Sequence, residues 1–409
     1  MYFGWNLGLE KGGTLGMAFA TCIMMIMYVC FSFSYCELSC AIPKAGGGFD
    51  YTNRAFGKGL GFITGLAQII EFVFAPPAIA IAIGAYLNLS FPQIPILPAA
   101  IVAYILFTAV NIFGVKIAAT FELLITILAV AELLLFFGVT IPHFSIEKFT
   151  LNANNNGWQG VFASIPFAIW FFLGIEGVAN VAEETINPQK DISKGFGSAI
   201  LTLVVLCVLV FTATIGVGGW EKVVYQVDGS LSDSPLPMAM GMTVSKDSVL
   251  YHLLIGVGLF GLIASFHGLI LAGGRATMEC GKIDYAPKFL GKVHPKFLTP
   301  ANALIANTAV GIAVLFTNKT GEIITIAVFG ALTLYILSMM ALLQLRKSEP
   351  NLERPFIVPL YPLLPITALL IGLFSLIAMS YFNPILALWY FGAILLGYIL
   401  FKIFYKGKK

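Results

Sequence analysis

Four glutamates within long apolar stretches are the residues of this sequence best placed to do chemistry. They are Glu71, Glu122, Glu132 and Glu176, and no lysine or arginine lies at a similar depth. A charged side chain at the centre of a bilayer costs about 2.5 kcal/mol or more, so such an acid is functional by default. An unpaired buried carboxylate stays protonated or binds a mobile cation. The set predicts a site for a cation, a proton, or both. For Glu122, near a helix end, the alternative is a neutral acid bonded to the backbone.

Glu71 is followed by an aromatic segment that ends in two prolines. Pro76 and Pro77 remove amide donors and clash with carbonyls one turn earlier, so we expect a kink that exposes carbonyl oxygens beside the acid. Together with Phe72 or Phe74, these groups would suit a small ammonium ion through charge and cation–π attraction. The alternative is a kink that serves packing alone.

Two glycines flank Glu176 in another apolar span. Gly174 and Gly177 are poor residues for a helix interior, and backbone groups freed by a break can line a hydrated cavity but cannot face lipid. The pattern predicts a helix break at Glu176, with close helix packing as the alternative. A corresponding interruption is expected at the N-terminus, in Phe3-Gly4-Trp5-Asn6.

Other polar and aromatic residues in the spans have two interpretations each. Trp170, six residues before Glu176, is either a gate over a bound ligand or an ordinary core residue. His267 either relays protons or is a hydrogen-bonded structural histidine. The sequence has no His-Glu-x-x-His and no Cys-x-x-Cys pattern. We therefore expect no metal site, no cofactor and no enzymatic activity, since an enzyme would need a convergent catalytic cluster.

The composition requires these residues to be positioned by membrane-spanning helices. The 409 residues are 59% hydrophobic and 11% charged, with a mean hydropathy of +0.92, whereas soluble domains carry about 25% charged residues. We predict an all-α polytopic membrane protein, in which each span takes roughly 20 residues. Eleven spans are expected, at residues 15–38, 59–87, 96–114, 117–141, 160–182, 196–219, 249–273, 300–317, 322–345, 360–380 and 384–404.

The lysines and arginines orient the predicted spans. Only five of the 23 lie in one set of loops, and the other 18 lie in the opposite set or in the C-terminal tail. The positive-inside rule places that tail in the cytoplasm of a multi-pass plasma membrane protein. Eleven spans then put Met1 outside or within the membrane. We interpret residues 1–9 as the second half of a first helix, with a true eleven-span protein as the alternative. The net charge of +3 is too small to indicate nucleic-acid binding.

Several motifs resemble those of the amino acid–polyamine–organocation transporter superfamily. The loop Pro43-Lys44-Ala45-Gly46-Gly47 is similar to its Pro-x-x-Gly-Gly loop, and residues 174–188 resemble its sixth helix. Residues 1–6 and 71–77 are similar to the ethanolamine permease branch. The resemblance implies twelve spans in a leucine-transporter-type fold with inverted five-helix repeats and a truncated first helix. The implied transporter core is 1–380 (remnant of helix one 1–9, repeat one 1–141, repeat two 160–345, helix eleven 360–380), and the last helix and basic tail are 384–409.

The resemblance also implies a function and a set of site residues. It predicts a secondary active transporter that imports ethanolamine or a similar amino alcohol by alternating access, with possible proton coupling. Tyr2, Phe3 and Trp5 crowd the position where amino acid transporters hold a carboxylate. Glu132 stands where several proton-coupled relatives have a lysine, and it joins Glu176 and His267 as a proton-coupling candidate. The predicted substrate-binding residues are Phe3, Gly4, Trp5, Asn6, Glu71, Phe172, Gly174, Glu176, Gly177 and Asn180, with Trp170 as gate.

Two alternatives to this function remain open. Within the superfamily, the substrate could be an amino acid or a polyamine. From another class, the chain could be a membrane nutrient sensor or a channel. Glu37, Glu183 and Glu184 lie at helix ends and are expected to pair with basic loop residues instead of binding substrate.

Overall fold

The computed structural model describes residues 1–114, 119–180, 182 and 185–404, without the side chains of 119–122. Glu183 and Glu184, and the side chain of Glu122, therefore lie outside the described residues. Over the described chain the protein is an all-α polytopic membrane protein, as the composition predicted.

Seventeen α-helices and one short 3-10 helix (Ile141–His143) form the described fold. The helices are α1 Leu7–Ala41, α2 Gly48–Phe56, α3 Lys58–Ser90, α4 Ile96–Phe113, α5 Ala119–Thr140, α6 Ile146–Thr150, α7 Gly157–Ala163, α8 Ile165–Trp170, α9 Gly177–Asn180, α10 Pro188–Gly216, α11 Glu221–Val224, α12 Pro235–Met240, α13 Val249–Lys282, α14 Ala301–Leu315, α15 Thr320–Ser348, α16 Leu363–Phe382 and α17 Pro384–Phe404.

The predicted spans all have helical counterparts. Within the described residues, nine helices are long and apolar enough to cross a membrane. The span predicted at 300–317 is the shorter apolar helix α14, and the one predicted at 160–182 is divided into α7, α8 and α9. The first span differs most, because α1 begins at Leu7 and contains a non-helical residue, Gly13, with φ +64°. Residues 7–12 thus form a short helical segment before the long one.

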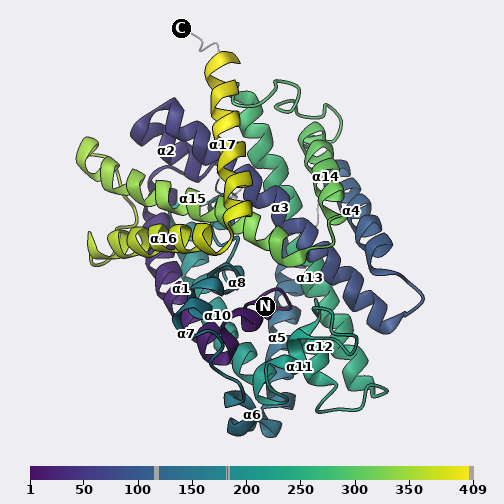
Figure 1. Ribbon diagram of the computed structural model, residues 1–409. Helices are drawn as coiled ribbons and strands as arrows, with labels where there is room; N and C mark the ends of the chain where they lie inside the picture. The colour runs from purple at the N-terminus through teal and green to yellow at the C-terminus, as the bar shows by residue number, and fades with distance from the viewer. Residues whose placement is uncertain (115–118, 181, 183–184, 405–409) are drawn as a thin grey trace.

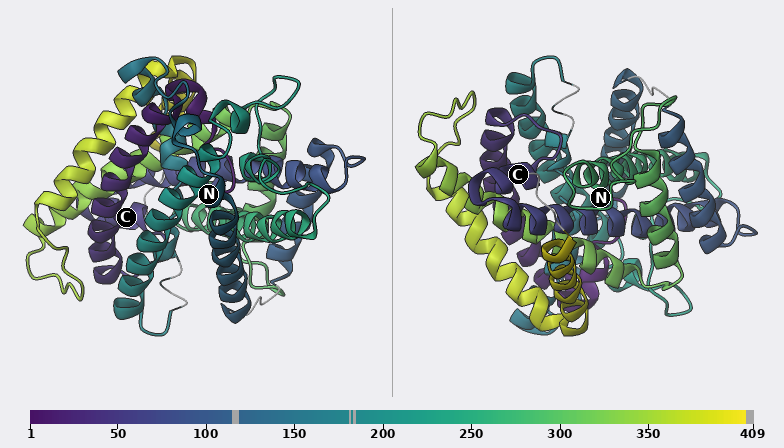
Figure 2. Two further views of the ribbon diagram at one scale, coloured as in Figure 1. Left: turned by 90° about the horizontal axis from the view of Figure 1, so that it is seen from below. Right: turned by 90° about the horizontal axis from the view of Figure 1, so that it is seen from above.

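The central helix of the bundle is α3, which packs against α4, α13 and α15. Helix α15 approaches it most closely at Gly330, where a β-carbon would lie 2.5 Å from the Ala67 carbonyl oxygen and 2.8 Å from the Glu71 amide nitrogen. Glycine therefore allows two backbones to meet beside Glu71. Helix α16 lies along α1 at the side of the bundle (Figure 2).

The two ends of the bundle carry different short elements. Helix α2 and the last turns of α17 lie at one end, and α6, α11 and α12 lie at the other (Figure 1). We call these the α2 end and the α12 end. Helix α1 runs toward the α2 end and α3 starts from it. Later residues of α1 and earlier residues of α3 therefore lie nearer to the α2 end.

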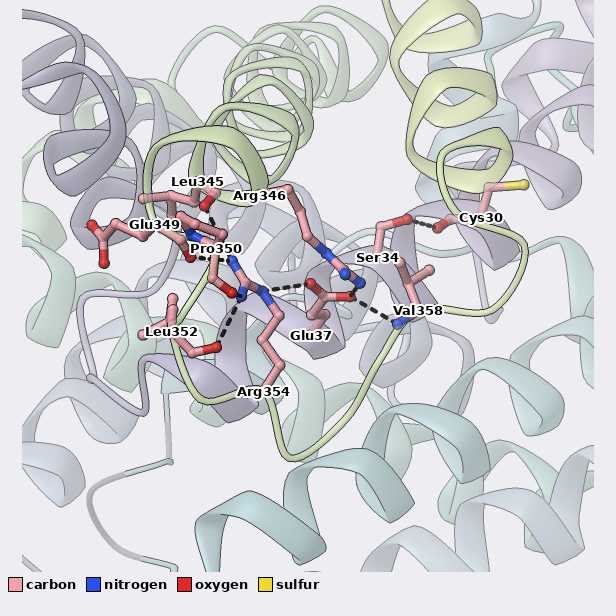
Figure 3. A network of polar contacts seen from close by, with 10 residues as sticks. All are labelled: Cys30, Ser34, Glu37, Leu345, Arg346, Glu349, Pro350, Leu352, Arg354 and Val358. Atoms are coloured by element: carbon pink, nitrogen blue, oxygen red, sulfur yellow. Dashed lines mark hydrogen bonds and ion pairs between the residues drawn. The ribbon is translucent and has the colours of Figure 1, made fainter.

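A buried ion-pair network closes the α2 end. The Glu37 side chain is 1% exposed, and its carboxylate accepts hydrogen bonds from the Arg346 guanidinium (2.7 Å) and the Val358 amide (2.8 Å). Arg354 pairs with the other Glu37 oxygen at 3.2 Å and also donates to backbone carbonyls around residue 350 (Figure 3). The prediction that Glu37 pairs with basic residues is confirmed, and the network joins α1 to the end of α15.

Candidate functional site

The predicted helix break at Glu176 is present. Helix α8 ends at Trp170 and α9 begins at Gly177, with a turn between them. Gly174 has φ +91°, a backbone conformation that side-chain-bearing residues rarely adopt. The turn places the Glu176 side chain in the centre of the bundle, fully buried.

A second non-helical segment, residues 1–6, packs against this break. Gly4 has φ +85°, and a β-carbon there would lie 2.6 Å from the indole nitrogen of Trp170. The rings of Phe3 and Trp170 meet edge to face at 5.6 Å. Two interrupted segments far apart in the sequence therefore lie side by side, as expected for a site built from exposed backbone groups.

The carboxyl groups of Glu71 and Glu176 face each other inside the protein. Both side chains are fully buried, and the two carboxyl groups interact directly with each other. The Tyr335 hydroxyl donates a 2.7 Å hydrogen bond to Glu176 Oε2. Among the described residues, no side chain outside the pair donates a hydrogen bond to Glu176 Oε1 or to either oxygen of Glu71. We call Glu71 and Glu176 the carboxyl pair; it leaves three acceptor oxygens for a proton or a small cation.

Aromatic rings enclose the carboxyl pair. Phe172 stacks on Tyr28 at 5.1 Å, and Phe31 packs against Tyr335 at 4.3 Å. The Tyr28 hydroxyl donates to the Tyr335 hydroxyl at 3.3 Å. A cation bound between the carboxyls would also face these rings. The sequence interpretation named Phe172 but missed Tyr28 and Tyr335, although a tyrosine deep in an apolar span needs a polar partner and could have been noticed for that reason.

The two prolines after Glu71 remove backbone hydrogen bonds, but they do not end helix α3. The helix continues through Pro76 and Pro77. The carbonyls of Phe72 and Val73 nevertheless lack their usual amide donors, because proline has none. Phe72 packs toward α13, where its backbone oxygen lies 3.1 Å from the position of a Gly273 β-carbon.

Asn6 and Trp5 hold the N-terminal segment in place. The Asn6 amide donates to the carbonyls of Ser232 (2.8 Å) and Val223 (3.3 Å), and its oxygen accepts from the Gly4 amide (3.0 Å). Trp5 stacks on Phe171 at 5.2 Å. Because both polar atoms of the Asn6 amide are engaged with the backbone, this residue anchors the loop at the α12 end.

The remaining predicted residues occupy three different surroundings. Glu132 lies beside Tyr2 and Tyr86, in a group separate from the carboxyl pair. His267 is half-buried and its ring contacts Phe107 on α4 at 6.4 Å. Asn180 is 5% exposed, and its side-chain oxygen has no hydrogen-bond partner among the described residues.

Open space adjoins the break. A cavity of about 160 Å³ is lined by Phe3, Trp170, Leu173 and Leu269, among others. A β-carbon at Gly177 would meet no atom within 4 Å. The predicted gate residue thus forms part of a cavity wall, between the N-terminal segment and the break.

Comparison with known proteins identifies the family. The family model described as amino acid permease matches residues 3–404. The chain is a member of the amino acid permease family. This agrees with the resemblance of residues 43–47 and 174–188 to the amino acid–polyamine–organocation superfamily.

The relatives of this family member are transporters. An uncharacterised transporter of Rhizobium meliloti is 27% identical over 90% of this chain and 80% of its own length. The methylthioribose transporter of Bacillus subtilis is 28% identical over 82% of this chain and 74% of its own. A branched-chain amino acid permease of Lactococcus lactis is 25% identical, with 88% and 81% covered. The protein is therefore an integral membrane transporter and not an enzyme.

Proposed function

We propose that this permease is a secondary active transporter that imports ethanolamine or a similar small amino alcohol across the plasma membrane. The observation that carries the proposal is the carboxyl pair, Glu71 and Glu176, buried without an ion-paired lysine or arginine in the described part of the chain. A buried carboxylate without a counter-ion is costly, and a protonated amine supplies both the charge and the donors that these oxygens lack.

The chemistry of the site favours a small amine over an amino acid. An ammonium group offers donors to Glu176 Oε1 and the two Glu71 oxygens, while Tyr335 keeps Glu176 in position. Tyr28 and Phe172, which stack on each other beside Tyr335, are the proposed aromatic neighbours of the cation. An amino acid would also need a partner for its carboxylate, and two acids repel that group. Asn180, whose amide oxygen has no hydrogen-bond partner among the described residues, is the proposed partner for the substrate hydroxyl.

The two non-helical segments are the proposed moving parts. Phe3 and Gly4 meet Trp170 at the break, so a tilt of either segment changes access to the carboxyl pair from the α12 end. We propose that Trp170 is the gate there. With the α2 end in the cytoplasm, a membrane potential drives a cation inward by about 2.3 kcal/mol per 100 mV.

Proton coupling is a further part of the proposal. Two adjacent carboxyls share a proton readily when no cation is bound, so arrival of an amine would displace it. Glu132 and His267 remain candidates for passing that proton onward. Uptake that is unaffected by dissipating the proton gradient, at a clamped membrane potential, would refute coupling.

An amino acid substrate is the second candidate, because relatives with 24–25% identity over about nine tenths of the chain are named branched-chain amino acid permeases. Uptake of labelled ethanolamine into proteoliposomes separates the two. We expect unlabelled ethanolamine to compete strongly, and propylamine and leucine to compete weakly. Competition by leucine without competition by ethanolamine would favour the second candidate.

A further inference from the structure

Four polar side chains lie one or two helical turns from the carboxyl pair and its tyrosines, all in the same direction. Tyr35 follows Tyr28 by seven residues on α1, and Ser338 follows Tyr335 by three on α15. Gln68 precedes Glu71 by three residues on α3, and Asn180 follows Glu176 by four at the end of α9. Helices α1 and α15 run toward the α2 end, and α3 runs away from it. Tyr35, Ser338 and Gln68 therefore lie on the α2 side of the carboxyl pair. Asn180 lies on the same side, because its side-chain oxygen is beside Gly47.

These four side chains are buried and have unsatisfied polar atoms. Their exposed fractions are 0% for Tyr35 and Ser338, 1% for Gln68 and 5% for Asn180. In the described part of the chain, the Tyr35 and Ser338 hydroxyls, the Asn180 oxygen and both polar atoms of the Gln68 amide form no hydrogen bond of normal geometry; a weaker contact joins the Tyr35 hydroxyl to the backbone of Gly48. The large majority of buried side-chain polar atoms have a hydrogen-bond partner, so four exceptions from four helices in one region require an explanation.

The glycine loop before α2 covers this region. A β-carbon on Gly47 would lie 2.9 Å from the Tyr35 hydroxyl and 3.0 Å from the Asn180 oxygen. One on Gly48 would lie 3.0 Å from the Ser338 hydroxyl. Gly47 has φ +58°. Any larger residue at these positions would press on the polar groups, so the glycines let the loop lie directly over them.

We infer that Tyr35, Gln68, Asn180 and Ser338 form a polar passage that connects the carboxyl pair with the α2 end. Its ligands are water and the amine itself on its way out of the carboxyl pair, and the loop at Gly47 and Gly48 is its closure. The passage rests on the proposed function, because it needs a substrate that leaves the pair. It explains why the four side chains keep polar atoms that form no normal hydrogen bond within the described residues.

The test compares transport with stability in three variants. Tyr35→Phe and Gln68→Met each remove unpartnered polar atoms and preserve size. If the atoms serve only the fold, removing them relieves a desolvation cost and leaves uptake unchanged. If they line the passage, initial uptake of ethanolamine into proteoliposomes falls by about tenfold, while the melting temperature stays equal or rises. The matched control is Tyr390→Phe, whose hydroxyl does have a partner, Thr333, at 2.8 Å. It should lower the melting temperature and keep the uptake.

The outcomes are separable. If the wild type takes up ethanolamine and both Tyr35→Phe and Gln68→Met take it up equally well, the passage is refuted and the proposed function still holds. Wild-type protein that takes up no amine would refute the proposed function and the passage with it. A lowered melting temperature in both variants would also contradict the passage, because it would show that the atoms have partners that stabilise the fold.

Discussion

The two glycines that flank Glu176 are expected to respond in opposite directions to the same substitution. Gly174 has φ +91° and only one atom, Leu269 Cδ2 at 3.6 Å, near the position of a β-carbon. Gly174→Ala therefore meets no steric clash, but it places an L-residue in a left-handed conformation at a cost of about 1–2 kcal/mol. Gly177 begins a helix and has no atom within 4 Å. Gly177→Ala is expected to stabilise the protein by about 0.5–1 kcal/mol, because alanine loses less backbone entropy.

The predicted separation between these variants is thus about 1.5–3 kcal/mol. Thermal unfolding of purified protein in detergent, followed by tryptophan fluorescence, gives the sign directly. An unbroken helix through residues 174–177 would instead make both alanine variants more stable by about 1 kcal/mol. Stabilisation by Gly174→Ala would therefore refute the helix break on which the site depends.

Three further predictions concern ion pairs, the site and pH. Glu37→Gln should lower the free energy of unfolding by about 3–5 kcal/mol, because it leaves buried arginine charge unpaired. Glu349→Gln removes an exposed pair with Arg54 (33% and 41% exposed) and should cost less than about 1 kcal/mol; equal losses in chemical denaturation would contradict this contrast. Tyr335→Phe removes the donor to Glu176, so uptake should fall by about tenfold and the free energy of unfolding by about 1–3 kcal/mol; unchanged uptake would exclude Tyr335 from the site. Burial raises the pKa of the Asp233 carboxyl to about 6 despite a hydrogen bond from Thr320. Since the folded protein then holds a proton that the unfolded chain releases near pH 4, stability should decrease between about pH 4 and 6 and remain lower above it. Asp233→Asn should flatten this decrease in melting temperature, and an unchanged pH profile would show that the Asp233 carboxyl is not responsible.

The membrane-spanning helices could be predicted because their signal is local. Apolar length alone located each span, and Gly174 and Gly177 marked the break that the structure contains. Local signals also placed the interruption at Gly4, since glycine tolerates its φ of +85°. The break at Gly13 agrees with the predicted separation of residues 1–9 from the span at 15–38, but its packing against Ala153 could not be predicted, because that contact joins distant parts of the chain.

The contacts of the site could be predicted only in part, since they join distant residues. The sequence indicated that Glu71 and Glu176 are both deep, but their pairing depends on how α3, α15 and the break pack together. The same holds for Tyr335, whose hydroxyl reaches Glu176 across 159 residues. Asn6 seemed free to bind substrate from its position alone, whereas the folded loop at Val223 and Ser232 occupies its amide.

The most direct test of the central claim is the binding of labelled ethanolamine to purified wild-type protein, Glu71→Gln and Glu176→Gln, with Glu349→Gln as a folded control. The account predicts that wild type and Glu349→Gln bind the amine equally, and that each variant of the carboxyl pair binds it about tenfold or more weakly while it melts at or above the wild-type temperature. Undiminished binding by both Glu71→Gln and Glu176→Gln would contradict the account.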